Sequence, residues 1–239
     1  LQQIKIYLNI IYIHISIQVN MSDDIKRVVY TLVNDFSKYR NISITDIPDE
    51  AKIIKDMDTL GFLRINAKRV SPRGSREDII ILVLDENKKY SLNSPELKKL
   101  LGNVDNEEAT KNNTLDEVIL VVGGAFETKK NLLDVIKSYQ QREVKGVDIN
   151  GRSAFYTLIY YRNLKRCIPE CVGVPKHILM STEETQSFCE SQLKTVKDFP
   201  FILHTDPQIL WIGGRPGQMV KIIRDSEATC NYIAYRTII

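Results

Sequence analysis

Two uninterrupted apolar runs constrain the fold of this 239-residue chain more than any other feature. The first spans residues 79–84 and closes at Asp85, and the second spans residues 118–122 and closes at Gly123. A strand with one solvated face alternates apolar and polar residues, whereas a run that is apolar at every position is typical of a strand covered on both faces. The two runs therefore predict an α/β layer in the first part of the chain.

Segments with helical periodicity surround these runs. Apolar residues recur at helical spacing in residues 23–40, which predicts an amphipathic helix. Further helices are expected over residues 94–101 and 129–139, a strand over 153–161, and a polar surface loop over 102–113. A helix is also expected after Pro48, with Ala51, Ile54, Met57 and Leu60 facing inward until Gly61 ends it.

The last third of the chain has a different character. Ser181 and Glu184 fit a capping box, and the helix that they open would turn Phe188, Cys189, Gln192 and Leu193 inward. Short strands separated by turns are expected at residues 201–204, 208–212, 219–224 and 231–238. We therefore expect an α+β protein, with an amino-terminal α/β domain of helices and a small sheet over residues 21–162 and a small mixed-sheet domain over residues 163–239.

Residues 1–20 are rich in isoleucine but do not fit a targeting segment. Lys5, His14 and several amides interrupt the apolar run, which makes it a poor membrane span, and it lacks the small-residue cleavage site of a signal peptide. We expect this stretch to be an upstream or non-native extension, with Met21 as the true start.

The glycine-rich stretch WIGGRPGQ, residues 211–218, raises the question of a phosphate-binding loop. Such a loop needs Gly-Lys-Ser/Thr at the start of a helix, so that backbone N–H groups converge on the anion. Here Gly217 is followed by Gln218 and an expected strand. We interpret the stretch as a tight turn between two strands, from which Arg215 projects.

Other chemical motifs are weak. A metal site could be assembled from Cys167, Cys171 and His177, completed by Cys189, His204 or Cys230, but the spacings lack the paired CxxC of a zinc site. Buried or incidental cysteines are the alternative. The chain also lacks the Gly-x-Ser-x-Gly motif of a nucleophilic serine. We expect no metal, no cofactor and no intrinsic active site.

One basic cluster stands out in a chain whose net charge is only +3. Lys68, Arg69, Arg73 and Arg76 lie within nine residues that contain no acid, in what we read as a turn-rich loop before a strand. Such a loop can contact a phosphate backbone without reading bases. A loop that is simply solvated is the equal alternative.

The last third of the chain holds a series of short motifs in a fixed order: Val174-Pro175-Lys176-His177, Thr205-Asp206-Pro207, Gly214-Arg215-Pro216-Gly217-Gln218, Val220-Lys221-Ile222-Ile223-Arg224, Ser226-Glu227 and Tyr232-Ile233-Ala234-Tyr235-Arg236. With these motifs, residues 174–239 resemble the assembly domain of the RNA polymerase subunit 5 family, the common subunit of eukaryotic RNA polymerases I, II and III. The archaeal counterpart of this subunit resembles this part alone. Residues 21–162 resemble, more weakly, the jaw domain that eukaryotic members add.

The chain also departs from this family. Cys171 stands where the family has a histidine, and Arg215-Pro216-Gly217 replaces a Lys-Arg-Gly turn, which puts any interaction of the missing cation in doubt. These departures, with the isoleucine and asparagine bias, suggest the protein of a large DNA virus.

The resemblance implies a non-catalytic polymerase subunit that docks on the largest subunit through its carboxy-terminal domain and places the jaw near downstream DNA. DNA contact would be weak and not sequence-specific, through Lys68, Arg69, Arg73 and Arg76. It implies neither a membrane nor a small-molecule substrate, and an intracellular location: host cytoplasm or virion if viral, nucleus if cellular. With 9 basic and 8 acidic side chains from residue 163 onward, the docking domain is nearly neutral, as a protein interface prefers. The candidate docking residues are His177, Asp206, Pro207, Arg215, Gly217, Gln218, Lys221, Arg224, Ser226, Glu227, Tyr235 and Arg236.

Two alternatives stay open at this point. The fold could serve a free-standing DNA-binding or adaptor module. It could also be a nuclease core, because Asp78 and Asp85 flank one apolar run, although the acidic-x-Lys pattern expected on a following strand is missing.

Overall fold

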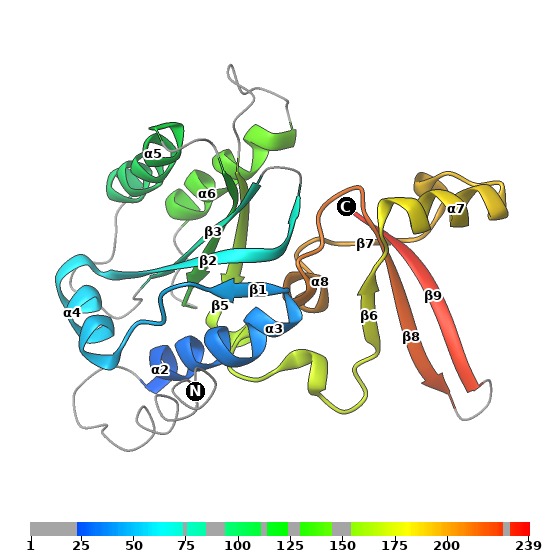
Figure 1. Cartoon of the computed structure of the whole chain (residues 1–239), viewed down its shortest axis with the longest axis horizontal. Helices are drawn as coiled ribbons and strands as arrows, with labels where there is room; N and C mark the ends of the chain where they lie inside the picture. The colour runs from blue at the N-terminus through cyan, green and yellow to red at the C-terminus, as the bar shows by residue number, and fades with distance from the viewer. Residues whose placement is uncertain are drawn as a thin grey trace.

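The computed structural model describes residues 23–73, 76–84, 94–110, 114–123, 130–144, 154–226 and 230–239. Residues 1–22, and with them the expected extension, lie outside this range. Two sheets, of strand order β1-β2-β3-β4-β5 and β6-β8-β9-β7, lie side by side with helices around them (Figure 1), which confirms the α+β class. In the described part of the chain, no helix is both long and apolar enough to cross a membrane.

The first sheet is mixed. Its strands are β1 (Ile42–Ile44), β2 (Phe62–Arg73), β3 (Arg76–Leu84), β4 (Leu115–Val122) and β5 (Phe155–Tyr160). The pairs β1–β2 and β2–β3 are antiparallel, and β3–β4 and β4–β5 are parallel. The two apolar runs are therefore neighbouring parallel strands, and every residue of β4 is buried, as a strand covered on both faces requires.

Helices cover both faces of this sheet. The amino-terminal helix runs through α2 (Asp23–Thr31), a π-helical segment (Leu32–Phe36) and α3 (Ser37–Tyr39), and with α4 (Glu50–Leu60) it packs on one face. On the other face lie α5 (Ser94–Thr110) and α6 (Lys130–Val144). The predicted helices are confirmed. Of the residues predicted to face inward on α4, Met57 is buried, but Ala51 is exposed and Leu60 is 53% exposed, and the other buried residue is Ile53.

The loop predicted over residues 102–113 is wrong as far as Thr110, because α5 continues through it. Leu97, Leu101 and Val104 are spaced by four and three residues and all lie in the core between α5 and the sheet. This spacing continues the buried stripe of the helix past Gly102, and it outweighs the polar composition of the segment.

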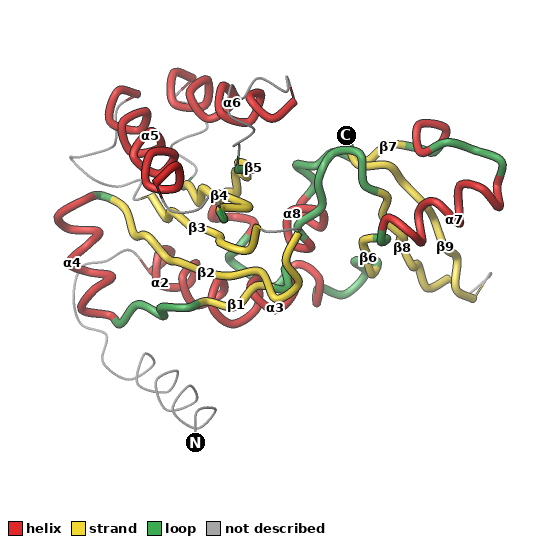
Figure 2. Tube along the Cα trace, turned by 45° about the horizontal axis from the view of Figure 1, so that its top comes forward, coloured by secondary structure: helices red, strands yellow, loops and turns green. Residues whose placement is uncertain are grey.

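The second sheet holds β6 (Lys176–Leu179), β7 (Phe201–Ile202), β8 (Met219–Ser226) and β9 (Cys230–Ile238). β8 pairs antiparallel with both β6 and β9, and β7 pairs parallel with the end of β9. α7 (Thr182–Gln192) packs beside these strands (Figure 2) and begins with the predicted Ser181–Glu184 capping box. Leu193, predicted to face inward, is 95% exposed, because it ends the helix in a left-handed conformation.

The strand predicted over residues 208–212 is wrong, because Pro207–Ile212 forms the helix α8. Asp206 is its N-cap and accepts a hydrogen bond from the backbone N–H of Gln208, while Pro207 occupies the first turn, where a missing N–H costs nothing. The glycine stretch therefore connects a helix to β8 and does not join two strands. Gly213 ends α8 with φ of 70°, a conformation that glycine adopts without strain.

α8 packs into two cores at once. Ile209 lies in the core of the second sheet with Val220, Ile222 and Ile238, whereas Leu210 and Trp211 lie in the core of the first sheet. The indole of Trp211 donates to the backbone oxygen of Asn163 and is 1% exposed. The division at residue 163 remains a prediction, and α8 is the element that ties the two sheets together.

Candidate functional site

The most unusual site in the structure is a buried group of charges between the two sheets, which we call the arginine cluster. It consists of Arg40, Arg69, Arg215, Asp116 and Glu117. Arg40 follows α3, Arg69 lies on β2, both carboxylates lie on β4, and Arg215 follows α8. The cluster thus joins four parts of the chain that are far apart in sequence.

Arg40 and Arg69 hold the two carboxylates from the first sheet's side. Arg40 is 3% exposed and donates to a carboxylate oxygen of Glu117 and to the backbone oxygen of Leu210 in α8. Arg69 donates from Nε to Asp116 Oδ2 at 2.8 Å and from Nη2 to Glu117 Oε2 at 3.0 Å. Thr157 on β5 adds a hydroxyl donor to Glu117. Buried charges of this kind are tolerated only when paired and hydrogen-bonded.

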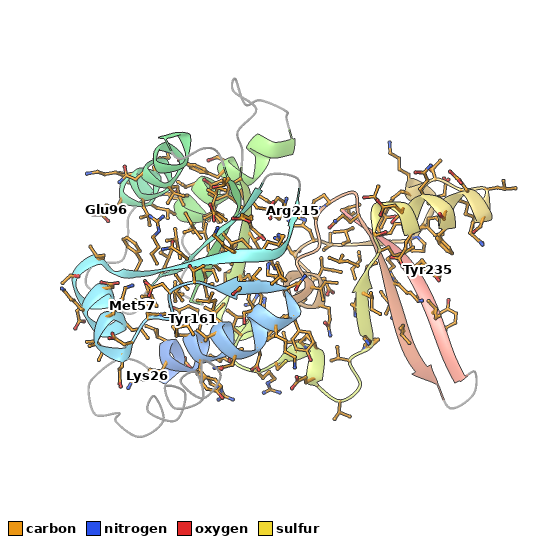
Figure 3. The ribbon with its side chains drawn as sticks, in the orientation of Figure 1. Lys26, Met57, Glu96, Tyr161, Arg215 and Tyr235 are labelled. Carbon is orange, nitrogen blue, oxygen red and sulfur yellow. The ribbon has the colours of Figure 1, made fainter. Side chains whose placement is uncertain are left out.

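Arg215, labelled in Figure 3, reaches Asp116 from the second sheet's side. Its Nη2 lies 3.0 Å from Asp116 Oδ2 and donates to the backbone oxygen of Asp116 at 3.2 Å, and its guanidinium lies 4.8 Å from the ring centroid of Phe155. The prediction that Arg215 projects from the turn was wrong, because Arg215 folds back to the buried acids. It is therefore a structural contact within the chain.

Electrostatics favour the ionised cluster. Burial by itself would raise the pKa of Glu117, but the charges of Arg40 and Arg215, with the hydrogen bond from Thr157, override it and lower the pKa to about 2. Three guanidinium groups face two carboxylates, and the Nε atoms of Arg40 and Arg215 are buried without a partner among the described residues. The cluster carries an excess of positive charge and tolerates no loss of a carboxylate.

This geometry corrects the basic segment of residues 68–76. The segment is not a loop up to Arg73, because β2 extends to that residue, and Arg69 faces the core with Leu63 and Ile65. Arg69 therefore leaves the set of DNA-proximal candidates. Lys68 is exposed and ion-paired with Glu77, while Arg73 and Arg76 face each other at the end of the β2–β3 hairpin, with side chains outside the described set.

Several candidate docking residues stabilise their own unit. Asp206 and Pro207 begin α8, and the side-chain oxygen of Gln218 accepts from the backbone N–H of Arg215 at 2.8 Å. The backbone N–H of Gly217 donates to Ile238. These contacts shape the turn before β8.

Two more candidates, on β9, also make contacts within the unit. The ring of Tyr235 stacks on Phe188 of α7 with centroids 4.0 Å apart, and Figure 3 shows it beside that helix. Arg236 donates to the backbone oxygen of Phe201 at 2.9 Å. Tyr235 therefore packs β9 against α7, and Arg236 links β9 to β7.

The remaining candidates lie on the strands of the second sheet. His177 on β6 is half-buried, with Nδ1 2.8 Å from the backbone oxygen of Pro175. Lys221 is half-buried and Arg224 exposed, both on β8. Ser226 ends β8 with a side chain outside the described set, and Glu227 lies outside the described residues. The structure brings Lys221 and Arg224 onto one strand of this sheet.

The alternative chemistries find little support in the described part of the chain. It holds no group of three His, Cys, Asp or Glu side chains that could bind a metal ion, and Cys167, Cys171 and Cys189 are free thiols. Asp78 accepts a hydrogen bond from the Thr114 hydroxyl, and Asp85 lies outside the described residues.

Sequence reasoning missed Arg40, Asp116 and Glu117. A usable signal was present: Asp116 and Glu117 directly precede the apolar run of β4, and carboxylates in a strand buried on both faces need cationic partners. Which arginines supply them depends on the tertiary fold, since Arg69 and Arg215 are 47 and 99 residues from Asp116.

Comparisons with known proteins match both parts of this architecture. The family model of the RNA polymerase Rpb5 carboxy-terminal domain matches residues 167–238. An African swine fever virus protein (isolate Tick/Malawi/Lil 20-1/1983), named DNA-directed RNA polymerase RPB5 homolog, is 30% identical over 216 residues, which cover 88% of this chain and 95% of the viral protein. The chain belongs to the RNA polymerase Rpb5 family.

Shorter matches come from cellular members of the Rpb5 family. Subunit RPABC1 of DNA-directed RNA polymerases I, II and III from Caenorhabditis elegans is 38% identical over 66 residues, 28% of this chain and 31% of that protein. Subunit Rpo5 of the DNA-directed RNA polymerase of Nitrosopumilus maritimus is 32% identical over 72 residues, 30% of this chain and 87% of that protein. The resemblance seen in the motifs is confirmed: the chain is a non-catalytic subunit of a multisubunit RNA polymerase.

Proposed function

We propose that this Rpb5-family chain docks on the largest polymerase subunit through residues 163–239 and holds residues 21–162 as a jaw near downstream DNA. The polymerase would be that of a large DNA virus, at work inside the cell. The observation that carries the proposal is the match to a viral RPB5 homolog over both parts of the chain, 216 residues in all. The surfaces of the two units add physical support for each half.

Exposed side chains on the second sheet support docking there. Tyr232 is 56% exposed and Ile233 38% exposed on β9, and Ile178 on β6 is equally open. Tyr232 lies on one face of this sheet and Ile233 and Ile178 lie on the other, so both faces beside β9 carry exposed apolar or aromatic side chains. Such side chains are typical of a protein interface, and tyrosine and arginine are enriched at its centre. The nearby Arg224 supplies the polar component.

DNA contact rests on weaker support. The end of the β2–β3 hairpin, with Arg73 and Arg76, lies on the amino-terminal unit and carries no carboxylate between the two arginines. Lys68 on the same hairpin is exposed, although Glu77 already pairs with it. Few cations that touch only phosphates give weak binding without sequence preference.

Affinity capture tests the docking half. Tagged chain expressed with its polymerase should retain the two largest subunits at stoichiometric levels, and their absence would sink the proposal. Tyr232→Asp places a charge in the proposed interface and should reduce capture strongly. The matched control is Val172→Asp, at a fully exposed position before β6, which should capture like the natural chain. Equal capture by both variants would put the docking surface elsewhere.

A further inference from the structure

Among the described residues, the outer edge of β9 is unpaired over most of its length. β9 spans nine residues, Cys230–Ile238, whereas its neighbour on that side, β7, has only two, Phe201 and Ile202. β7 pairs with β9 at Thr237 and Ile238, and no described residue pairs with that side of Ile233 or Tyr235. In Figure 1, β9 forms the outer margin of the second sheet down to the hairpin tip.

The direction of the free backbone groups follows from the bonds at the paired end. The N–H of Thr237 donates to Pro200 on the β7 side, while the N–H of Ile238 donates to Gln218 on the β8 side. Backbone groups alternate along a strand, so the N–H and C=O of Tyr235 and Ile233 point outward with those of Thr237. The edge thus presents two donors and two acceptors at strand spacing, which is a template for another strand.

The two faces beside this edge differ from each other. Facing residues of an antiparallel pair share a face, so Ile233 lies with Ile223, and Tyr235 with Lys221, on the face that α7 partly covers. Tyr232 lies with Arg224 on the opposite face. An added strand would meet an isoleucine pair on one side and an exposed tyrosine beside an arginine on the other.

The charges on this sheet indicate what kind of segment would pair with β9. The described side chains of β6, β8 and β9 include Lys176, Lys221, Arg224 and Arg236 and no carboxylate; Asp225 and Glu227, toward the hairpin tip, lie outside that set. The described side chains of these strands therefore carry four positive charges, whereas three acids, Glu183, Glu184 and Glu190, lie off the sheet on α7. A second copy of the chain pairing through β9 would bring the same cations together, which disfavours self-association.

We infer that the free edge of β9 accepts an extended acidic segment of the largest polymerase subunit as an added strand. Main-chain hydrogen bonds to Ile233 and Tyr235 would supply affinity, and apolar and acidic side chains on alternate positions would supply specificity. The added strand would continue the line that β7 begins. This inference rests on the proposed function and refines it to one edge and one mode of contact.

The test separates the backbone from the side chain at one position. Ile233→Pro replaces the isoleucine side chain and also removes the outward backbone N–H. Ile233→Thr replaces the isoleucine side chain but keeps the backbone N–H, and threonine is a good strand former. Purified full-length chains are titrated against the purified largest subunit. Because each missing main-chain bond leaves a partner carbonyl unsatisfied, the proline variant should bind about tenfold more weakly than the threonine variant.

The possible results distinguish the strand-addition inference from the docking proposal. If the natural chain binds the largest subunit and the two Ile233 variants bind equally, the strand-addition inference is overturned while the docking proposal stands. If the natural chain does not bind, the docking proposal itself fails. A charge arm compares Arg224→Glu, expected to weaken binding, with Lys197→Glu, an exposed position off the sheet expected to bind normally.

Hydrogen exchange gives a second reading that needs no variant. In the free chain the amides of Ile233 and Tyr235 should exchange quickly, and that of Ala234, which faces β8, slowly. On binding the largest subunit, only the first two should become protected. Binding without new protection at those two amides would overturn the inference, even if the proline variant failed to fold.

Discussion

Glu117 is the residue whose neutralisation tests the arginine cluster most directly. It is buried, and Glu117→Gln keeps the shape of the side chain while removing its charge. Arg40 and Arg69 would then face an amide in place of a carboxylate, and Asp116 would be the only acid left for three guanidinium groups. Removing one partner of a buried ion pair costs about 3–5 kcal/mol, since the other charge stays buried and unpaired.

The pKa of Glu117 gives a second, independent magnitude. It lies near 2 in the folded chain against an ordinary value of 4.5, and each pKa unit is worth roughly 1 kcal/mol, so the ionised form contributes about 3 kcal/mol. Because the folded pKa is depressed, this stability is present above pH 4.5 and is lost as the pH falls toward 2. At pH 3 less than about half of it should remain.

Urea unfolding followed by tryptophan fluorescence measures the effect. The chain has one tryptophan, Trp211, which packs against Phe36 and Tyr39 at the junction of the two units. We expect Glu117→Gln to lower the free energy of unfolding by about 3 kcal/mol at pH 7 and by progressively less below pH 4.5.

The control for this prediction is Glu77→Gln, which breaks the exposed Lys68–Glu77 ion pair of the same sheet and should cost less than about 1 kcal/mol. The reasoning would be refuted if the Glu117 variant lost no more stability than this control. A loss at pH 7 that persisted unchanged at pH 3 would also contradict it, because the charge would then not be its cause.

Two further predictions concern packing and DNA contact. Gly214→Ala should destabilise the chain by about 1–3 kcal/mol in the same unfolding assay, because an added Cβ would lie 2.6 Å from Ile238 Cδ1. Gly102→Ala, in the interior of α5 with no atom within 4 Å of its added Cβ, should instead stabilise by about 0.5–1 kcal/mol, and a matching loss at both sites would contradict the packing argument. Replacing both Arg73 and Arg76 by glutamine should reduce the salt slope of DNA binding by the assembled polymerase by about 0.9 for each phosphate that is no longer neutralised. An unchanged slope would remove this hairpin from the DNA path, and Arg69 stays intact in that experiment since its replacement would break the cluster.

Sequence patterns correctly predicted the helices and strands that depend only on a few neighbouring residues. The apolar runs of β3 and β4 and the capping box at Ser181 were each sufficient by themselves. The prediction for the α8 segment failed because Ile209 to Ile212 is a four-residue apolar run without a clear period. Such a run occurs in both strands and helices. The deciding signal was Asp206-Pro207 at its start, a capping residue followed by proline.

The sequence did not predict the arginine cluster, for a different reason. Arginines at positions 69 and 215 look like surface cations in the sequence, because charged residues are mostly exposed and their partners are distant. Only the crossing of β2, β4 and the loop after α8 brings them to the same two carboxylates. The strands that carry the candidate docking residues Lys221, Arg224, Tyr235 and Arg236 were predicted correctly, whereas the free edge of β9 depends on how short β7 is.

The junction between the two units connects the proposed docking edge of β9 to the amino-terminal unit. α8 is held by both units, because Ile209 packs into the core of the second sheet while Leu210 and Trp211 pack into the core of the first. Rotating one unit against the other would expose Trp211 and separate Arg215 from Asp116, which leaves a buried charge unpaired. A partner strand bound at β9 would therefore determine the direction of the β2–β3 hairpin through a rigid connection. Under the proposed function, docking would therefore also place the jaw, because α8 and the arginine cluster hold the two units together.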